Sequence, residues 1–273
     1  MLLVRTLLGS LIIVIISVAL LVDHRLNSDV GFTVVLATIL MLGVHELMGL
    51  YRKRDYTAFS VVATAAAGVL VVAGWAEHHQ LAGAPWVPAA AFAFVVTCFL
   101  CQWFITPRPA GVVSISLTIF AVTYVWGLGS FLQRIRYLEG DGLAAVVLFL
   151  TMVKLSDIGG YFTGRFLGRV HPFKVSPKKS LEGYIGSLAL TAVAGVLVGH
   201  WFFPERSWHY WLVFSAVVWF FGGLGDLLES LLKRDLGAKD SARFPGLGGV
   251  LDMIDSVLLA APPVYLMLRH LSG

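Results

Sequence analysis

Long apolar runs alternate with short polar segments from one end of the chain to the other. The runs are about 17 to 25 residues long, which is enough for a helix to cross the hydrocarbon core of a bilayer. The pattern predicts about nine transmembrane helices. They lie near residues 6–22, 30–50, 59–76, 86–104, 111–132, 143–163, 183–203, 209–228 and 249–268. We therefore expect an all-α, polytopic integral membrane protein.

The composition and the placement of basic residues support this expectation. Of the 273 residues, 58% are hydrophobic and only 13% are charged, against about 25% charged residues in soluble domains. With the N-terminus inside, the basic segments 52–54, 164–182 and 233–248 all lie on the inner face, as the positive-inside rule requires. The net charge of +4 comes without a basic block, which argues against nucleic-acid binding. We divide the chain into N-terminal membrane spans, residues 1–140, and a C-terminal catalytic region in the membrane, residues 141–273.

One acid in the N-terminal half stands inside a predicted span. Glu46 follows His45, but residue 49 is Gly, so the zinc-protease pattern HExxH is absent. An ionisable group in a span is costly unless it has a partner or a function. We expect Glu46 to pair with a base on another helix, with a contribution to an active site as the alternative.

A first polar cluster follows the sixth run, in KLSDIGGYFTGRFLGRVHPFKVSPKKSLEG. Lys154 and Asp157 are three residues apart and can pair along a helix. Glycines after Asp157 allow close approach of a ligand or of another backbone. The loop then supplies Ser176, Lys178, Lys179, Ser180 and Glu182. Such a loop suits either anionic lipid headgroups or a clamp on a phosphate group, and the spacing alone does not separate the two.

A second cluster surrounds the start of the last run. Asp226, Ser230 and Lys233 fall on one helix face, with Glu229 beside it. Lys239 and Asp240 follow in a loop, and Asp252 and Asp255 share a face of the final helix. Acids from two helices, beside bases and a glycine-rich turn, predict a site for Mg²⁺ and a polyphosphate. The positive end of the final helix, opened by Gly246, Gly248 and Gly249, is expected to face an anion; salt bridges between helices are the structural alternative.

These residues carry a resemblance to a known family. The stretch from Ser230 to Asp255 resembles the signature of the phosphatidate cytidylyltransferases, or CDP-diacylglycerol synthases. SLLKRDLGAKD fits that signature throughout, PGLGG fits except at one residue, and LDMIDS keeps both aspartates. SDIGGYFTGRFLGR, SPKKSLEG and GDLLES are also similar to family elements. Leu247 stands where the family usually has His and Met253 where it usually has Arg, and the preceding loop is one residue shorter, so the chain looks like a divergent member.

The resemblance implies a reaction and a set of roles. CTP and phosphatidic acid would give CDP-diacylglycerol and pyrophosphate, with Mg²⁺ as cofactor and a second cation left open. The site would face the cytoplasm from a bacterial inner membrane, and a homodimer is left open. Asp226, Asp252 and Asp255 are the expected Mg²⁺ ligands, with Asp240 and Asp157 as further candidates. Lys233, Arg234 and Lys239 would bind phosphates, Ser176, Lys178, Lys179 and Glu182 would form the opposite wall, and Ser230, Gly248 and Gly249 would contact substrate.

Two alternatives stay open on the sequence. A related enzyme could use CTP as a kinase, or transfer CMP to a polyprenol or isoprenoid lipid phosphate. A cation-coupled transporter would also need acids within the membrane, but transporters often show repeated halves, whereas the acids here crowd at one end of the chain.

Overall fold

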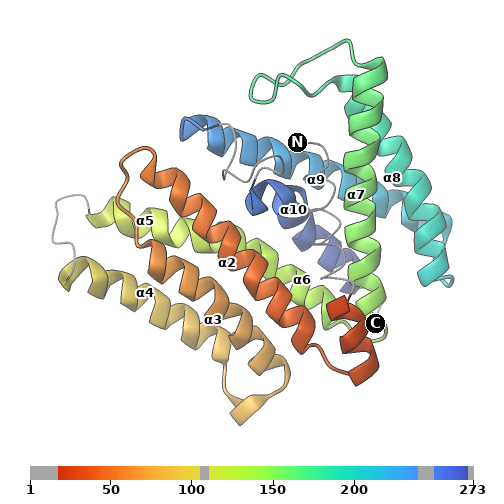
Figure 1. Ribbon diagram of the computed structural model, residues 1–273. Helices are drawn as coiled ribbons and strands as arrows, with labels where there is room; N and C mark the ends of the chain where they lie inside the picture. The colour runs from red at the N-terminus through yellow and green to blue at the C-terminus, as the bar shows by residue number, and fades with distance from the viewer. Residues whose placement is uncertain (1–17, 105–110, 239–248, 270–273) are drawn as a thin grey trace. The chain divides into compact units, whose positions relative to one another are not determined.

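A computed structural model of the protein describes residues 18–104, 111–238 and 249–269. Within those residues it contains helices and no strand (Figure 1). Residues 18–26 are helical. The helices that follow are α2 (Val30–Arg52), α3 (Ser60–His78), the short η1 (Leu81–Gly83), α4 (Trp86–Phe104), α5 (Gly111–Val122), the π-helical turn η2 (Thr123–Gly127), α6 (Leu128–Arg136), α7 (Gly142–Leu167), α8 (Leu181–Phe202), α9 (Trp208–Asp235) and α10 (Val250–Arg269). The predicted all-α architecture is confirmed.

Eight helical segments in the described part of the chain are long and apolar enough to cross a membrane. The stretch Gly111–Arg136 counts as one of them, because α5, η2 and α6 follow one another without a break. The first predicted run, 6–22, lies mostly outside the described residues. Large apolar side chains also cover the outside of the helices; Val61 and Trp201, for example, are each 83% exposed. Such a surface is stable against lipid, and the protein is an integral membrane protein.

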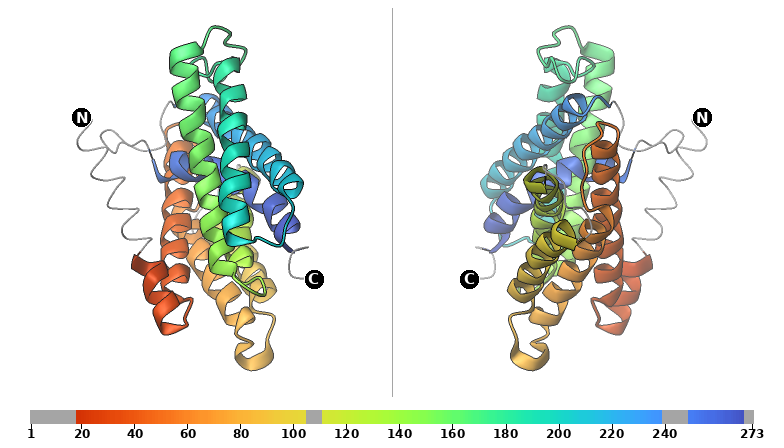
Figure 2. Two further views of the ribbon diagram at one scale, coloured as in Figure 1. Left: turned by 90° about the vertical axis from the view of Figure 1, so that its right-hand side faces the viewer. Right: turned by 90° about the vertical axis from the view of Figure 1, so that its left-hand side faces the viewer.

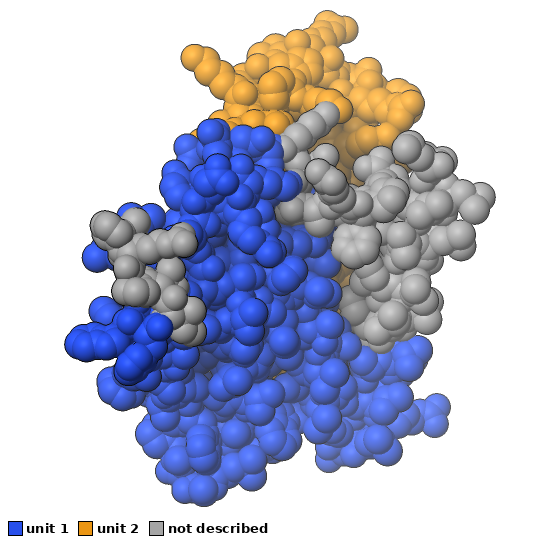
Figure 3. Space-filling model, turned by 60° about the vertical axis from the view of Figure 1, so that its left-hand side comes forward, with its two compact units in different colours: residues 1–133, 235–253 blue, residues 134–234, 254–273 orange. Residues whose placement is uncertain are grey.

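The chain divides into two compact units, which Figure 3 colours separately. The first comprises residues 1–133 and 235–253, and the second residues 134–234 and 254–273. In the first unit α2 packs beside α3, and α3 beside α4 (Figure 1). The α2–α3 connection is held to α5 by two hydrogen bonds: the Thr57 and Ser114 hydroxyls lie 2.7 Å apart, and the Phe59 N–H donates to Thr118 Oγ1 at 3.0 Å. The predicted functional division at residue 140 stays a prediction.

In the second unit α7 and α8 run side by side along most of their lengths (Figure 2). Glycines make this possible. A Cβ atom at Gly183 would lie 2.8 Å from the Gly160 carbonyl oxygen and 3.0 Å from the Gly164 Cα. The close approach that the sequence predicts for the glycines after Asp157 is therefore made by the backbone of α8.

In the same unit α9 contacts both α8 and α10. Trp219 Nε1 on α9 donates to the Tyr184 carbonyl on α8 at 2.8 Å. Near the start of α9, the Tyr210 hydroxyl donates to the Met267 carbonyl near the end of α10, at 3.0 Å. Further along α9, Gly225 lies against Asp255 near the start of α10. α9 and α10 therefore pack antiparallel.

The glycine contact between α7 and α8 gives a stability prediction. Gly183→Ala should destabilise the protein by about 1–3 kcal/mol, because the added methyl meets backbone atoms that cannot rotate away. Gly49→Ala on α2 is the matched control: nothing lies within 4 Å of its Cβ position, so alanine should add about 0.5–1 kcal/mol through its higher helix propensity. The midpoint of thermal unfolding in detergent measures both. An unchanged midpoint for Gly183→Ala would contradict this packing of α7 against α8.

Candidate active site

Two aspartates lie at a close contact between α9 and α10. Gly225 has no side chain, and a Cβ atom there would lie 2.5 Å from the Asp255 carbonyl oxygen. Asp226 follows Gly225 directly, and Asp255 lies in the second turn of α10. The Asp226 and Asp255 carboxylates lie near enough to interact electrostatically, and Asp255 is only 7% exposed.

A third aspartate joins them from α7. Asp157 interacts electrostatically with both Asp226 and Asp255. Its carboxylate also accepts from Lys154 Nζ at 3.3 Å, which confirms the predicted pairing along the helix. Three helices, α7, α9 and α10, therefore each supply one acid to a shared region, which we call the aspartate cluster (Asp157, Asp226 and Asp255).

Each member of the aspartate cluster also has a partner close by. Lys179, at the end of the α7–α8 loop, forms an ion pair with Asp226. Asp255 Oδ1 accepts from the backbone N–H of Ser256 at 2.5 Å and lies 3.1 Å from the Ser256 hydroxyl, which donates to it. Since like charges repel strongly where water is scarce, these partners offset part of the cost of gathering acids within a membrane span.

The donor chemistry of the aspartate cluster fits a hard divalent cation, because Mg²⁺ takes carboxylate oxygens as ligands. The three carboxylates do not converge tightly on one point. In the described residues, only Asp29, His78 and His79 place three ligand atoms within 4.8 Å of one another. An ion shared by the aspartate cluster would therefore require small side-chain movements, with Lys179 and Lys154 as the paired cations to be displaced.

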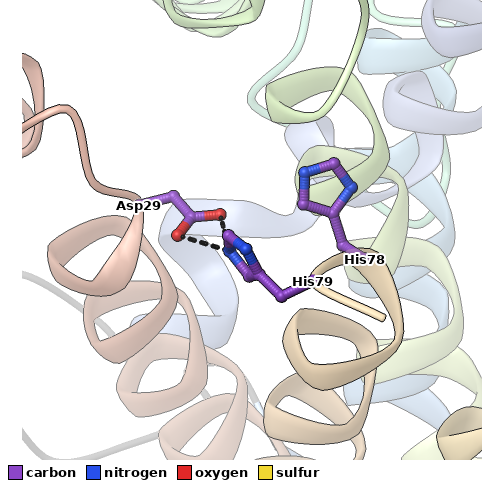
Figure 4. Close-up of side chains that lie close together, drawn as sticks. All are labelled: Asp29, His78 and His79. Atoms are coloured by element: carbon purple, nitrogen blue, oxygen red, sulfur yellow. Dashed lines mark hydrogen bonds and ion pairs between the residues drawn. The ribbon is translucent and has the colours of Figure 1, made fainter. Parts of the chain in front are cut away.

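The group of Asp29, His78 and His79 belongs to the first unit and has a different character. The His79 imidazole lies 3.0 Å from Asp29 Oδ1, and that oxygen also accepts from Trp75 Nε1 at 3.0 Å. Figure 4 shows the His78 ring beside this pair, and one ligand atom from each of the three residues lies within 4.8 Å of the other two. His78 ends α3 and His79 is its C-cap, and no ion is needed to explain the hydrogen bonds that Asp29 accepts. The group ties the start of α2 to the end of α3.

The α7–α8 loop, residues 168–180, is held by side chains at both of its ends. Glu182 accepts from the backbone N–H groups of Arg169 and Val170, at 3.0 and 3.2 Å. Ser180 caps α8 by accepting from the Gly183 N–H at 3.1 Å. The Glu182 carboxylate, predicted for the substrate wall, thus stabilises the loop itself, and its substrate role stays a prediction.

The predicted phosphate-binding residues of this loop take different positions. Lys178 is exposed, Ser176 and Lys179 are half-buried, and Ser180 is buried. At the end of α9, Arg234 Nε donates to the Val175 carbonyl at 3.5 Å, which brings it beside the loop. Arg234 and the loop lysines thus form one basic region next to the aspartate cluster, which Lys179 contacts directly.

Directly before Arg234, Lys233 pairs with Glu229 one turn earlier at 2.5 Å, and the Glu229 side chain is fully buried. The sequence places Glu229 only beside the predicted face, so this buried pair is a finding of the structure. Ser230 lies half-buried in the same turn.

The start of α10 differs from its expected role. The Val250 and Leu251 N–H groups donate to Glu46 Oε1 and Oε2 at 2.8 and 2.9 Å, and the Gly249 N–H donates to Asp252 Oδ2 at 2.7 Å. Glu46 on α2 and Asp252 on α10 itself therefore satisfy these three amides at the positive end of the helix. The expectation that this end faces a substrate anion is therefore wrong in this structure. The partners of Glu46 include helix amides, which the sequence pattern did not predict.

Three of the predicted site residues, Lys239, Asp240 and Gly248, lie outside the described residues. So does Leu247, one of the two departures from the family pattern. Met253, the other departure, lies half-buried on α10 between Asp252 and Asp255.

Comparison with known proteins identifies the family of this chain. A sequence model described as the cytidylyltransferase family matches residues 3–271. The chain is 28% identical to the phosphatidate cytidylyltransferase of Synechocystis, over 92% of each chain. It is 38% identical to the enzyme of that name from Mycobacterium leprae, over 57% of this chain and 50% of the relative, and 37% identical to that of Staphylococcus haemolyticus, over 48% and 51%. Since the family match runs over nearly its whole length, the chain belongs to the cytidylyltransferase family.

Proposed function

We propose that this protein is a phosphatidate cytidylyltransferase, which makes CDP-diacylglycerol and pyrophosphate from CTP and phosphatidic acid in phospholipid synthesis. The observation that carries the proposal is the aspartate cluster with Lys179 beside it, in a chain whose family and relatives bear this activity in their names. Family membership does not favour a lipid kinase or a transporter. The site would lie at the cytoplasmic face of a bacterial inner membrane, where soluble CTP meets a membrane lipid.

The reaction can proceed without a side chain acting as base. A phosphate monoester has a second pKa near 6, so the phosphatidate phosphate is largely dianionic at neutral pH and is itself the nucleophile. One of its oxygens forms a bond to the α-phosphorus of CTP, and the bond from that phosphorus to the oxygen bridging to the β-phosphorus breaks. Pyrophosphate leaves with the bond's electrons. The protein has to hold two polyanions in line and to offset the charge that grows on the leaving group.

In this reaction the acidic residues would bind the metal ion and the basic residues would bind phosphate groups. Asp226, Asp255 and Asp252 would hold Mg²⁺, with Asp157 and Asp240 as additional ligands for it or for a second cation. The bound ion would supply charge neutralisation at the pyrophosphate. Lys179 can exchange its ion pair with Asp226 for a phosphate oxygen, and Lys178, Ser176 and Arg234 lie in the same basic region. Lys233 and Lys239 would add positive charge toward the triphosphate.

The test is a reaction with purified protein, CTP, phosphatidic acid and MgCl₂ in mixed micelles. We expect CDP-diacylglycerol and pyrophosphate in equal amounts, and no product after chelation with EDTA, with recovery on adding Mg²⁺ back. Release of CDP in place of pyrophosphate would identify a kinase instead. Absence of any CDP-lipid across phosphatidic acid and polyprenyl phosphate acceptors would contradict the proposed function.

A further inference from the structure

A buried glutamate on α2 holds the start of the helix that carries Asp252 and Asp255. Glu46 is 8% exposed, and its two carboxylate oxygens accept separately from the Val250 and Leu251 N–H groups, at 2.8 and 2.9 Å. Glu46 and these two residues lie more than 200 positions apart in the chain, and all three belong to the first unit. Glu46 therefore acts as a cap on α10 supplied from another helix.

This arrangement gives hydrogen-bond acceptors to backbone amides in the first turn of α10. The first amides of any helix have no partner within the helix, and the residues that start α10 are Gly249 and apolar Val250 and Leu251, which supply no capping side chain. A carboxylate near this end also interacts favourably with the helix dipole. Bonding through both oxygens fixes the rotation of the first turn as well as its position.

The rotation of that turn decides where the acids of α10 point. Asp252 comes directly after the two capped residues, and its own Oδ2 accepts from the Gly249 N–H at 2.7 Å. Asp255 follows one turn later on the same helix. A first turn that frayed would free Asp252 to rotate and would loosen the turn that contains Asp255.

We propose that Glu46 is a positioning residue for the metal-binding acids of α10: it touches neither metal nor substrate, and it sets the geometry of Asp252 and Asp255 by capping the helix. The metal in this inference rests on the proposed function, and the positioning role of Glu46 rests on the capping contacts. It assigns a catalytic consequence to a residue in the N-terminal half, outside the motifs that resemble the family signature.

Glu77 provides a matched control for the test. Its carboxylate, on α3, accepts from the Val87 N–H in the first turn of α4 at 2.9 Å. Glu46→Gln and Glu77→Gln thus make the same chemical change to a carboxylate that accepts from the start of another helix. α4 carries no aspartate or glutamate, so only the change at residue 46 should affect the acids of α10.

The first measurement is amide hydrogen exchange without metal. In Glu46→Gln, peptides covering residues 249–256 should exchange at least about tenfold faster than in the parent protein, since loss of a cap exposes the first amides to opening. Peptides from α8 should be unchanged, and so should residues 249–256 in Glu77→Gln. Unchanged exchange at the start of α10 in Glu46→Gln would overturn the capping role.

The second measurement is the Mg²⁺ concentration that gives half the maximal rate. It should rise at least about fivefold in Glu46→Gln, and high Mg²⁺ should restore much of the rate; Glu77→Gln should match the parent. A lower rate with an unshifted Mg²⁺ requirement would show a structural role only and overturn the proposal. If Glu46→Gln cannot be purified in folded form, Glu46→Asp, which withdraws the carboxylate by one methylene, is judged by the same criteria.

Failure of the proposed function can be told apart from failure of this inference. If the parent protein makes no CDP-lipid, the function is wrong, and titration with Mn²⁺ followed by electron paramagnetic resonance replaces the rate measurement. Weaker Mn²⁺ binding in Glu46→Gln than in Glu77→Gln would then support the positioning role, and equal binding would overturn it.

Discussion

Replacing Asp255 with asparagine should lower the rate of cytidylyl transfer by about 10³-fold or more, without a loss of thermal stability. Asp255 is nearly buried and interacts electrostatically with Asp226 and Asp157. A carboxylate that binds a cation contributes mainly in the transition state, when charge grows on the leaving group. Removing one electrostatic contact of this kind typically lowers the rate 10²- to 10³-fold. Loss of a metal ligand should have a larger effect. In the metal-free protein the same charge sits among like charges, so the neutral amide should leave the unfolding midpoint unchanged or raise it.

The fold should survive this substitution because an asparagine oxygen can still accept from the Ser256 N–H, as Asp255 Oδ1 does. Asp141→Asn is the matched control. Asp141 caps α7 by accepting from the Ala144 N–H at 2.8 Å, and asparagine caps helices about as well as aspartate. Rates of CDP-diacylglycerol formation and unfolding midpoints should be measured on all three proteins. A rate for Asp255→Asn within about threefold of the parent would remove Asp255 from the proposed metal site.

The membrane architecture was predictable because the bilayer imposes a simple length rule on each helix. In the described part of the chain eight spans appear where apolar runs predict them, and the span predicted at 111–132 continues to Arg136, where α6 ends. Gln133, polar but 4% exposed, is accommodated by donating to the Val71 carbonyl at 3.0 Å. Hydropathy alone does not register such a compensating bond.

The acids of the site were predictable as a set, while their partners were not. Local spacing gives the Lys154–Asp157 pair, since both residues lie on one helix. The pairing of Asp226 with Lys179, and of Glu46 with the start of α10, depends on which helices become neighbours. That choice depends on contacts between residues far apart in the chain, which local spacing does not reveal. For the same reason the anion-facing helix end was predicted wrongly: the carboxylate that fills it comes from α2.

Adding one methyl group at Gly225 should test how closely the two proposed metal ligands must be held. In Gly225→Ala the new Cβ would lie 2.5 Å from the Asp255 carbonyl oxygen and 3.1 Å from the Leu259 Cβ, so α9 and α10 must separate. We expect a loss of about 1–3 kcal/mol in stability and a fall of about 10²-fold in rate, because displacements near 1 Å between reacting groups have effects of that size.

Gly222→Ala, three residues earlier on α9, distinguishes geometry from a general effect of alanine. Its Cβ would lie 3.8 Å from Ser256, an ordinary contact, so stability should hold or rise slightly through helix propensity and the rate should stay within about twofold of the parent. If Gly225→Ala and Gly222→Ala retain equal rates while only the former unfolds earlier, then the approach of α9 to α10 serves packing alone, and Asp226 and Asp255 need not share an ion. If the rate falls at Gly225 by far more than the unfolded fraction explains, the spacing of those two carboxylates is itself part of catalysis.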